Sequence, residues 1–222
     1  MGISPSPGEV ILAHRGVLLL DELTEFAPGV LTALRRPLDE KVVTISGARG
    51  RFTCPCNFTL VATMRPCPCG YHGDLGRECT CSPSEVFQHR RSVDRLLLDR
   101  IDVFVEVTRV EHEKLMSPSP GEISLQIRGR VQRAWELQRP RFRGSSTSTN
   151  AEMMPQEVVE HCKLEDEAHR LLQTANERLH LSTRAFYRLL KLSRTIADLA
   201  GVETIRVFHL AEALQYRPRS AV

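Results

Sequence analysis

The chain has 222 residues, of which 41% are hydrophobic and 26% charged, and its formal net charge at pH 7 is +3. This length allows one large domain or two small ones, and the composition excludes wholesale disorder. No apolar run approaches the ~18 residues of a membrane helix, and the opening MGISPSPGEV lacks the pattern of a secretion signal. We therefore expect a cytoplasmic protein with no membrane partner, in which the seven cysteines are thiols or metal ligands.

The first hundred or so residues alternate apolar runs with turn residues. Gly16–Leu20 and Phe58–Thr63 predict buried strands, the first apolar on both faces. Phe26–Leu38 has helical spacing, and we expect Pro37 to end that helix. Val42–Thr53 predicts a hairpin that turns at Gly47-Ala48-Arg49-Gly50.

A loop rich in Cys, Pro and Gly follows, from Arg65 to about Pro83. We then expect a helix over Ser84–Leu98 with Ser84 as its cap, and a third strand over Ile101–Val107. Strands separated by helices indicate an α/β fold with a parallel sheet.

The pattern becomes helical further on. Ile123–Gln138 predicts a helix, and Arg141–Asn150 (RFRGSSTSTN) reads as a polar linker. Further helices are expected over Pro155–His161, Glu165–Leu179, Thr183–Leu199 and Val207–Gln215. We therefore divide the chain into an α/β part (1–110), a helix and linker (111–150) and an all-helical domain (151–222).

Asp21 and Glu22 follow directly on the apolar run that predicts the first strand. Carboxylates at the carboxyl end of a parallel strand meet the ligand crevice of phosphate-transfer proteins. One can hold Mg²⁺ and the other can polarise an attacking water. Alone the signal is weak, because many strands end in such a pair.

The surrounding motifs are more specific. They include PGEVILAHRGVLLLDELTEF, VVTISGARGRFTCP, TLVATMRPCPCGYHGDLGRECTCSP, LLDRIDVFVEV, STRAFYRLLKLSRTIADLAG and HLAEALQYR. In this order they resemble the magnesium-chelatase-like AAA+ ATPases, and within them the ComM/YifB branch, over nearly the whole chain. The resemblance implies part of an AAA+ α/β core followed by a helical lid, with ATP and Mg²⁺ as cofactors.

The resemblance also implies roles for individual residues. Asp21 would be the Mg²⁺-linked Walker B aspartate, Glu22 the catalytic carboxylate and Arg100 an arginine finger that acts on a neighbouring subunit of a hexameric ring. Arg184 would be the sensor-2 arginine, and Arg65 lies at the sensor-1 nucleotide position. From the residues alone, Arg100 could instead pair with Asp99 or Asp102, and Arg184 could be a solvated helix charge.

The chain departs from the family pattern at two places. Only four of the 30 basic residues are lysines, and none lies in the GK[ST] of a phosphate loop. Arg65 stands where the family has Asn, and Arg, unlike Asn, cannot accept a hydrogen bond. In addition, Arg95-Leu96 replaces a Gly-Pro. We therefore expect a divergent copy or a fragment that starts inside the ATPase domain and binds ATP poorly by itself.

Two C-x-C pairs, Cys67/Cys69 and Cys79/Cys81, are separated by a glycine-containing loop. Four thiolates can satisfy tetrahedral Zn²⁺, with His72 as a possible substitute ligand. The alternative is four reduced thiols in a mobile loop, because a single intervening residue strains chelation by each pair.

The resemblance also implies DNA contacts at the hairpin tip, where Arg49 and Arg51 could touch a DNA backbone. An arginine-rich stretch, 128–143, could also contact phosphates or could be a solvated helix face and linker. No aromatic residue accompanies the tip, so base-specific readout is not supported.

We thus expect a fragment of an ATPase that couples ATP hydrolysis to DNA branch migration in recombination and competence. Its partners would be DNA and further copies of itself or complete subunits. The alternatives are a chelatase-type motor subunit for metal insertion and a non-catalytic zinc-binding interaction module.

Overall fold

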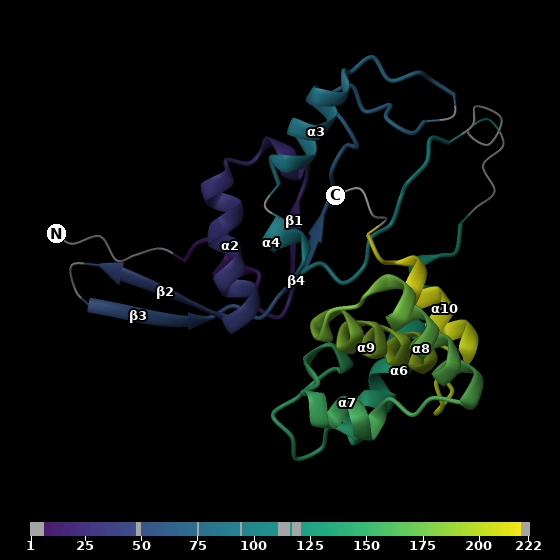
Figure 1. Ribbon diagram of the computed structural model, residues 1–222. Helices are drawn as coiled ribbons and strands as arrows, with labels where there is room; N and C mark the ends of the chain where they lie inside the picture. Colours follow the sequence, from purple (N-terminus) through teal and green to yellow (C-terminus); the bar gives the residue numbers. More distant parts are fainter. Residues whose placement is uncertain are drawn as a thin grey trace. The chain divides into compact units, whose positions relative to one another are not determined.

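The computed structural model describes residues 7–47, 50–74, 76–93, 95–110, 116 and 121–218. The chain divides into two compact units, one that ends at Ile101 and one that runs from Asp102 to Pro218. We call them the N-terminal unit and the C-terminal unit. Strands and helices are mixed in the first, and helices dominate the second (Figure 1). The expected combination of a partial α/β core and a helical C-terminal region is confirmed.

A short parallel strand pair forms the sheet of the N-terminal unit. After α1 (Glu9–Leu12), strand β1 (Val17–Leu20) pairs with β4 (Thr59–Ala62), Val17 opposite Thr59 and Leu20 opposite Ala62. Both strands were predicted, but the expectation that β1 is buried on both faces is wrong. Leu20 is 8% exposed, whereas Val17 is 62% and Leu19 60% exposed. One face of this pair therefore lies open to solvent.

Helix α2 (Pro28–Glu40) packs against β2 and α4. Leu31 and Leu34 are buried, as their helical spacing indicates. The prediction that Pro37 ends the helix is wrong, since the helix runs on to Glu40. Proline removes one hydrogen bond to the preceding turn, but so few residues follow that the loss is confined to the end of the helix. Lys41 ends it in the left-handed region at φ 57°, and its N–H donates to the Pro37 carbonyl.

Strands β2 (Val42–Gly47) and β3 (Gly50–Pro55) form the predicted antiparallel hairpin. The Thr44 and Thr53 hydroxyls lie 3.2 Å apart across the two strands. In Figure 1 this hairpin extends as an arm away from the β1–β4 pair. The expected tip residue Arg49 lies outside the described residues.

Two helices, α3 (Pro83–Arg91) and α4 (Arg95–Leu98), replace the single helix expected over Ser84–Leu98. The predicted cap is also wrong, because Ser82 caps α3. The Glu85 N–H donates to Ser82 Oγ at 3.3 Å, and the Ser82 N–H donates to the Glu85 carboxylate at 2.7 Å. This capping box follows from the Ser-x-x-Glu spacing, which is the stronger signal for a helix start.

The strand expected over Ile101–Val107 does not form, and residues 101–110 have no regular secondary structure. Val105 and Val107 are 66% and 90% exposed, and the Phe104 N–H donates to the Tyr216 carbonyl at 2.9 Å. An alternating pattern becomes a strand only when an edge is available for pairing. Each described strand pairs with one other strand only, and none of them pairs with residues 101–107.

The C-terminal unit is built from α6 (Ser124–Arg141), the short 3₁₀ helix η2 (Asn150–Glu152), α7 (Pro155–His161), α8 (Asp166–Leu179), α9 (Thr183–Leu199) and α10 (Val207–Gln215). The predicted bounds of α7, α9 and α10 are confirmed, and α8 begins one residue later than expected. Helix α9 packs against α6, α7 and α10. Ala197, Ile205 and Leu210 are completely buried in its core.

A buried polar network lies within this core. The Asp198 carboxylate accepts from Arg194 Nε at 3.1 Å, from Arg141 Nη1 and Nη2 at 2.6 and 2.7 Å, and from Asn150 Nδ2 at 2.7 Å. Arg194, Asp198 and Asn150 are each no more than 2% exposed. The segment expected to be a polar linker, Arg141–Asn150, therefore supplies both its ends to the interior of the C-terminal unit.

None of the described helices combines the length and the apolar character that crossing a bilayer requires.

Candidate nucleotide site and cysteine cluster

The polar ends of β1 and β4 meet at the same edge of the sheet, because the two strands are parallel. The Thr63 hydroxyl donates to Asp21 Oδ1 at 2.6 Å and accepts from the Glu22 N–H at 2.8 Å. The Leu23 N–H donates to the Thr63 carbonyl at 2.8 Å. Thr63 thus joins the acidic pair after β1 to the end of β4.

Glu22 has an unusual backbone and a well-defined carboxylate. Its φ of 62° places it in the left-handed region, just before the short 3₁₀ helix η1 (Leu23–Glu25). Its two oxygens accept from the Arg65 main-chain N–H at 3.1 Å and from Arg65 Nε at 2.8 Å. Arg65 Nη2 also lies 3.7 Å from Glu25 Oε1. The residue that departs from the family pattern is therefore the residue that holds Glu22.

These contacts decide what the strand ends can do chemically. Asp21 is exposed, and its bond to Thr63 uses one of about four acceptor positions of a carboxylate. Oxygen donors of this kind suit Mg²⁺, so Asp21 fits the ion. Glu22 is 29% exposed and its charge is balanced by the Arg65 guanidinium. Each Glu22 oxygen accepts one hydrogen bond from Arg65, so about two acceptor positions remain for a water.

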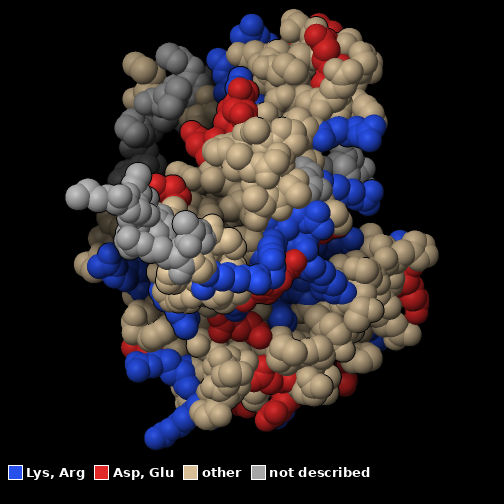
Figure 2. Space-filling view, turned by 90° about the vertical axis from the view of Figure 1, so that its left-hand side faces the viewer, with Lys and Arg blue, Asp and Glu red and all other residues tan. Residues whose placement is uncertain are grey.

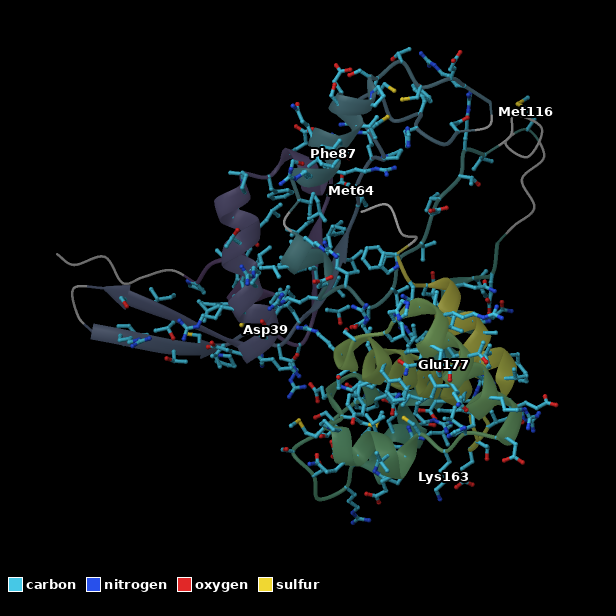
Figure 3. All side chains as sticks on the ribbon, viewed as in Figure 1. Asp39, Met64, Phe87, Met116, Lys163 and Glu177 are labelled. Carbon is cyan, nitrogen blue, oxygen red and sulfur yellow. The ribbon has the colours of Figure 1, made fainter. Side chains whose placement is uncertain are left out.

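Arg100 follows α4 in the N-terminal unit and binds an acid that the sequence did not suggest. Its Nε lies 2.9 Å from Asp39 Oδ1, its Nη2 also pairs with Asp39, and its Nη1 donates to the Leu96 carbonyl. Its side chain is 13% exposed. Asp39, labelled in Figure 3, lies in the last turn of α2. Arg100 is therefore ion-paired, and Asp39 is an acid to which it is paired.

Arg184 lies in the first turn of α9 in the C-terminal unit and is exposed. Ser182 caps this helix by accepting from the Ala185 N–H at 3.2 Å. Burial raises the pKa of Asp102 above its usual value, although the nearby charges of Arg188, Lys191 and Arg184 act in the opposite direction.

The candidate DNA residues differ in their surroundings. Arg51 is exposed on β3 opposite Ser46. In the arginine-rich stretch, Arg141 forms an ion pair with Asp198, and Arg130 Nη1 lies 2.6 Å from Glu122 Oε1. Figure 2 shows basic and acidic side chains interspersed on the face it presents. The stretch 128–143 is therefore not a uniform row of exposed charges.

The four cysteines of the two C-x-C pairs come together, with their sulfur atoms all within 4.8 Å of one another. Cys67 Sγ lies 3.4 Å from Cys69 Sγ and 3.7 Å from Cys79 Sγ, and the Cys69 and Cys79 sulfurs are 3.6 Å apart. Cys67 is completely buried. Such a group can hold a metal ion. His72, considered from sequence as a substitute ligand, does not belong to this four-sulfur group.

The cysteine pKa values separate within the cluster. A hydrogen bond from the Tyr71 backbone is the largest effect on Cys69 and lowers its pKa to about 5. At Cys81 a backbone hydrogen bond from Cys69 lowers the pKa, but burial and the neighbouring thiols outweigh it and raise the value to about 12. The cluster therefore favours one thiolate first and resists further charge unless a cation is present.

Two family models match this chain. The model described as magnesium chelatase, subunit ChlI, matches residues 1–115, and the model of the ChlI C-terminal region matches residues 121–217. The chain therefore belongs to the magnesium chelatase ChlI-subunit family, as its motifs indicated.

Several curated relatives are similar to this chain over nearly its whole length. Competence protein ComM of Haemophilus influenzae is 41% identical over 217 residues, and the uncharacterized protein YifB of Escherichia coli is 38% identical over 218 residues. An uncharacterized protein of Mycobacterium bovis is 34% identical over 215 residues. Each alignment covers 97% of this chain but only 42% of the relative. The chain thus spans less than half the length of these relatives.

Sequence reasoning singled out Asp21, Glu22 and Arg65 but missed the residues that organise them. Thr63 was seen only as the end of a strand, although a hydroxyl at the carboxyl end of a parallel strand is a usable signal. Asp39 gave no signal, because its contact with Arg100 depends on how α2 and α4 pack.

Proposed function

We propose that this chain is part of a ComM/YifB-type AAA+ ATPase subunit that couples ATP hydrolysis to DNA branch migration during recombination. The proposal is supported above all by the edge where β1 and β4 end, at which Asp21, Glu22, Thr63 and Arg65 form one hydrogen-bonded set. Similarity to a competence protein supports the DNA-related role.

We assign Asp21 to hold Mg²⁺ and Glu22 to accept the proton of the attacking water. Mg²⁺ would supply charge neutralisation at the transferring phosphoryl group of ATP. Arg65 and Arg184 are the proposed nucleotide contacts, and Arg51, with Arg49, the proposed contacts to a DNA backbone.

Arg100 is the proposed arginine finger of a ring, in which it would act on ATP held by the neighbouring subunit. Arginine fingers in GTPases contribute about 10³–10⁵ to the rate. The bond to Asp39 holds the guanidinium in a defined place within its own subunit. In this proposal the Arg100 guanidinium must break some or all of its hydrogen bonds to Asp39 when the ring closes.

The test is ATP hydrolysis by the protein expressed from its own gene, with and without branched DNA. Glu22→Gln should abolish hydrolysis while ATP binding persists, because an amide cannot accept the proton of the water. Glu25→Gln is the matched control, since Glu25 lies farther from Arg65, and should retain activity. Hydrolysis at an unchanged rate in Glu22→Gln would contradict the assignment.

The hexameric ring can be tested separately by measuring the mass of the protein with ATP and Mg²⁺. We expect a hexamer under these conditions and a smaller species in their absence. A monomer under both conditions would contradict the ring.

A second candidate is a chelatase-type motor that drives metal insertion, which the description of the family model favours. Stimulation of ATP hydrolysis by branched DNA would favour the first candidate over this one. A third candidate is a non-catalytic module. The hydrogen bond that Arg65 Nε donates to the Glu22 carboxylate favours this candidate. Failure of the protein expressed from its own gene to bind ATP would favour this third candidate, whereas poor binding by the 222-residue chain alone is expected in either case.

A further inference from the structure

The loop between β4 and α3 folds back on itself so that two distant C-x-C pairs meet. Gly70 and Gly73 adopt φ values of 82° and 86°, which side-chain-bearing residues rarely adopt. The Asp74 carboxylate accepts from the Gly76 and Arg77 N–H groups at 2.7 and 3.0 Å, which closes a second turn. These turns place Cys79 against Cys67 and Cys69.

The sulfur–sulfur distances identify the kind of site. A tetrahedral ion with Zn–S bonds of about 2.3 Å places its ligands about 3.8 Å apart. The three distances of 3.4, 3.7 and 3.6 Å among Cys67, Cys69 and Cys79 lie close to that edge length. A disulfide would require about 2.05 Å, and none of the seven cysteines is in one.

Main-chain groups surround the sulfurs in the way that metal thiolates need. Cys69 is hydrogen-bonded by the backbone of Tyr71 and of Thr80, and Cys79 by the backbone of Cys81. Such second-layer bonds orient ligands and disperse their charge.

We propose that Cys67, Cys69, Cys79 and Cys81 bind one Zn²⁺ ion as four thiolates. Binding releases one proton from each thiol that is protonated beforehand and forms four Zn–S bonds, without oxidation or reduction. Thiolate ligands select Zn²⁺ over Mg²⁺ and Ca²⁺, which prefer oxygen. This site therefore differs from the proposed Mg²⁺ site in both ligand type and metal.

The ion also fixes neighbouring residues. Arg65, which holds Glu22, precedes Cys67 by two positions, and Ser82, which caps α3, directly follows Cys81. From α3, His89 Nε2 lies 3.1 Å from the Arg65 carbonyl, and Arg90 Nε donates to the Pro66 carbonyl at 3.4 Å. Zinc thus anchors both ends of a segment that presents Arg65 to Glu22.

The first experiment measures metal content. The chain purified without chelator should contain one zinc per molecule and no iron, and Cys69→Ser and Cys79→Ser should contain almost none. Cys54→Ser, on the hairpin, is the matched control and should retain one zinc. Iron in place of zinc, or zinc retained by both cluster variants, would overturn the proposal.

A second measurement uses only the wild-type chain, so it does not depend on how the variants fold. The wild-type chain stripped of metal should take up one equivalent of Co²⁺ and show the visible absorption of a tetrahedral thiolate complex, which Zn²⁺ then displaces. Uptake without that absorption would overturn the four-thiolate site. Neither measurement involves ATP, so failure of the proposed ATPase function would leave this result unaffected.

A third measurement follows the loop itself. Arg77 lies in the exposed part of the loop and is a trypsin site, with its guanidinium 4.0 Å from the centre of the Tyr71 ring. Removing zinc should accelerate cleavage at Arg77 many-fold, and adding Zn²⁺ should restore protection. Equal rates with and without zinc would contradict the anchoring role.

Discussion

The two units of this chain obtain their order in different ways. The C-terminal unit has a continuous apolar core from Phe142 to Ala213, within which the charged network around Asp198 is buried. The N-terminal unit has two short parallel strands with an exposed apolar face, and polar contacts and cysteines organise its loops. The helical unit therefore depends on packing, whereas the candidate site depends on a few specific polar and sulfur contacts.

Metal removal should produce the largest difference between the responses of the two units. Structural zinc contributes apparent binding free energies of about 10–16 kcal/mol in small zinc-finger peptides, which is an upper limit for this loop. A strong chelator should therefore raise deuterium uptake in the segment 66–81 and leave α9 unchanged. Hydrogen-exchange mass spectrometry measures this uptake, and equal changes in both units would contradict a specific role of the metal in the N-terminal unit.

Asp198→Ala should destabilise the C-terminal unit by about 3–5 kcal/mol, because it leaves the buried Arg194 and the largely covered Arg141 without their counter-charge. Denaturant unfolding followed by circular dichroism measures the loss. Glu167→Ala, which removes an exposed acid from α8, should change the free energy of unfolding by no more than about 0.5 kcal/mol. Similar losses in the two variants would show that the buried network does not stabilise this unit.

Thr63→Val should lower the free energy of local opening at the candidate site by about 0.5–1.5 kcal/mol, since valine can neither donate to Asp21 nor accept from the Glu22 N–H. Faster exchange of the Glu22 and Leu23 amides, measured by NMR, would report the loss. Thr59→Val, at the other end of β4, is the matched control and should leave both amides unchanged. Unchanged amides in Thr63→Val would mean that the hydroxyl does not hold the strand ends together.

The smallest effect is expected from pH, through His209. This side chain is 1% exposed, and burial lowers its pKa below the usual 6.5. The unfolded chain therefore takes up a proton before the folded chain does, so stability is lost as pH falls through about 6.5. His209→Gln should flatten the pH dependence of unfolding below pH 7, and the exposed-residue control His169→Gln should not. An unchanged pH dependence in His209→Gln would exclude this titration.

The sequence predicts the helices of the C-terminal unit well because their apolar residues recur at the helical period, as in α9. It also predicts both C-x-C pairs as one candidate metal site. It does not predict that Asn150 is buried, since a polar segment enters a core only when partners such as Asp198 come from another helix. The contact between Arg65 and Glu22 likewise cannot be predicted from the sequence, because it depends on the parallel register of β1 and β4.

The exposed face of the β1–β4 pair has a consequence for behaviour in solution. Val17, Leu19 and Val61, which are 62%, 60% and 44% exposed, occupy matching positions on neighbouring strands and so form a continuous apolar strip. Salts such as ammonium sulfate are excluded from the protein surface and therefore favour the burial of apolar surface of this kind. The chain should therefore self-associate more as protein concentration and sulfate concentration rise, and Leu19→Lys should raise its solubility limit.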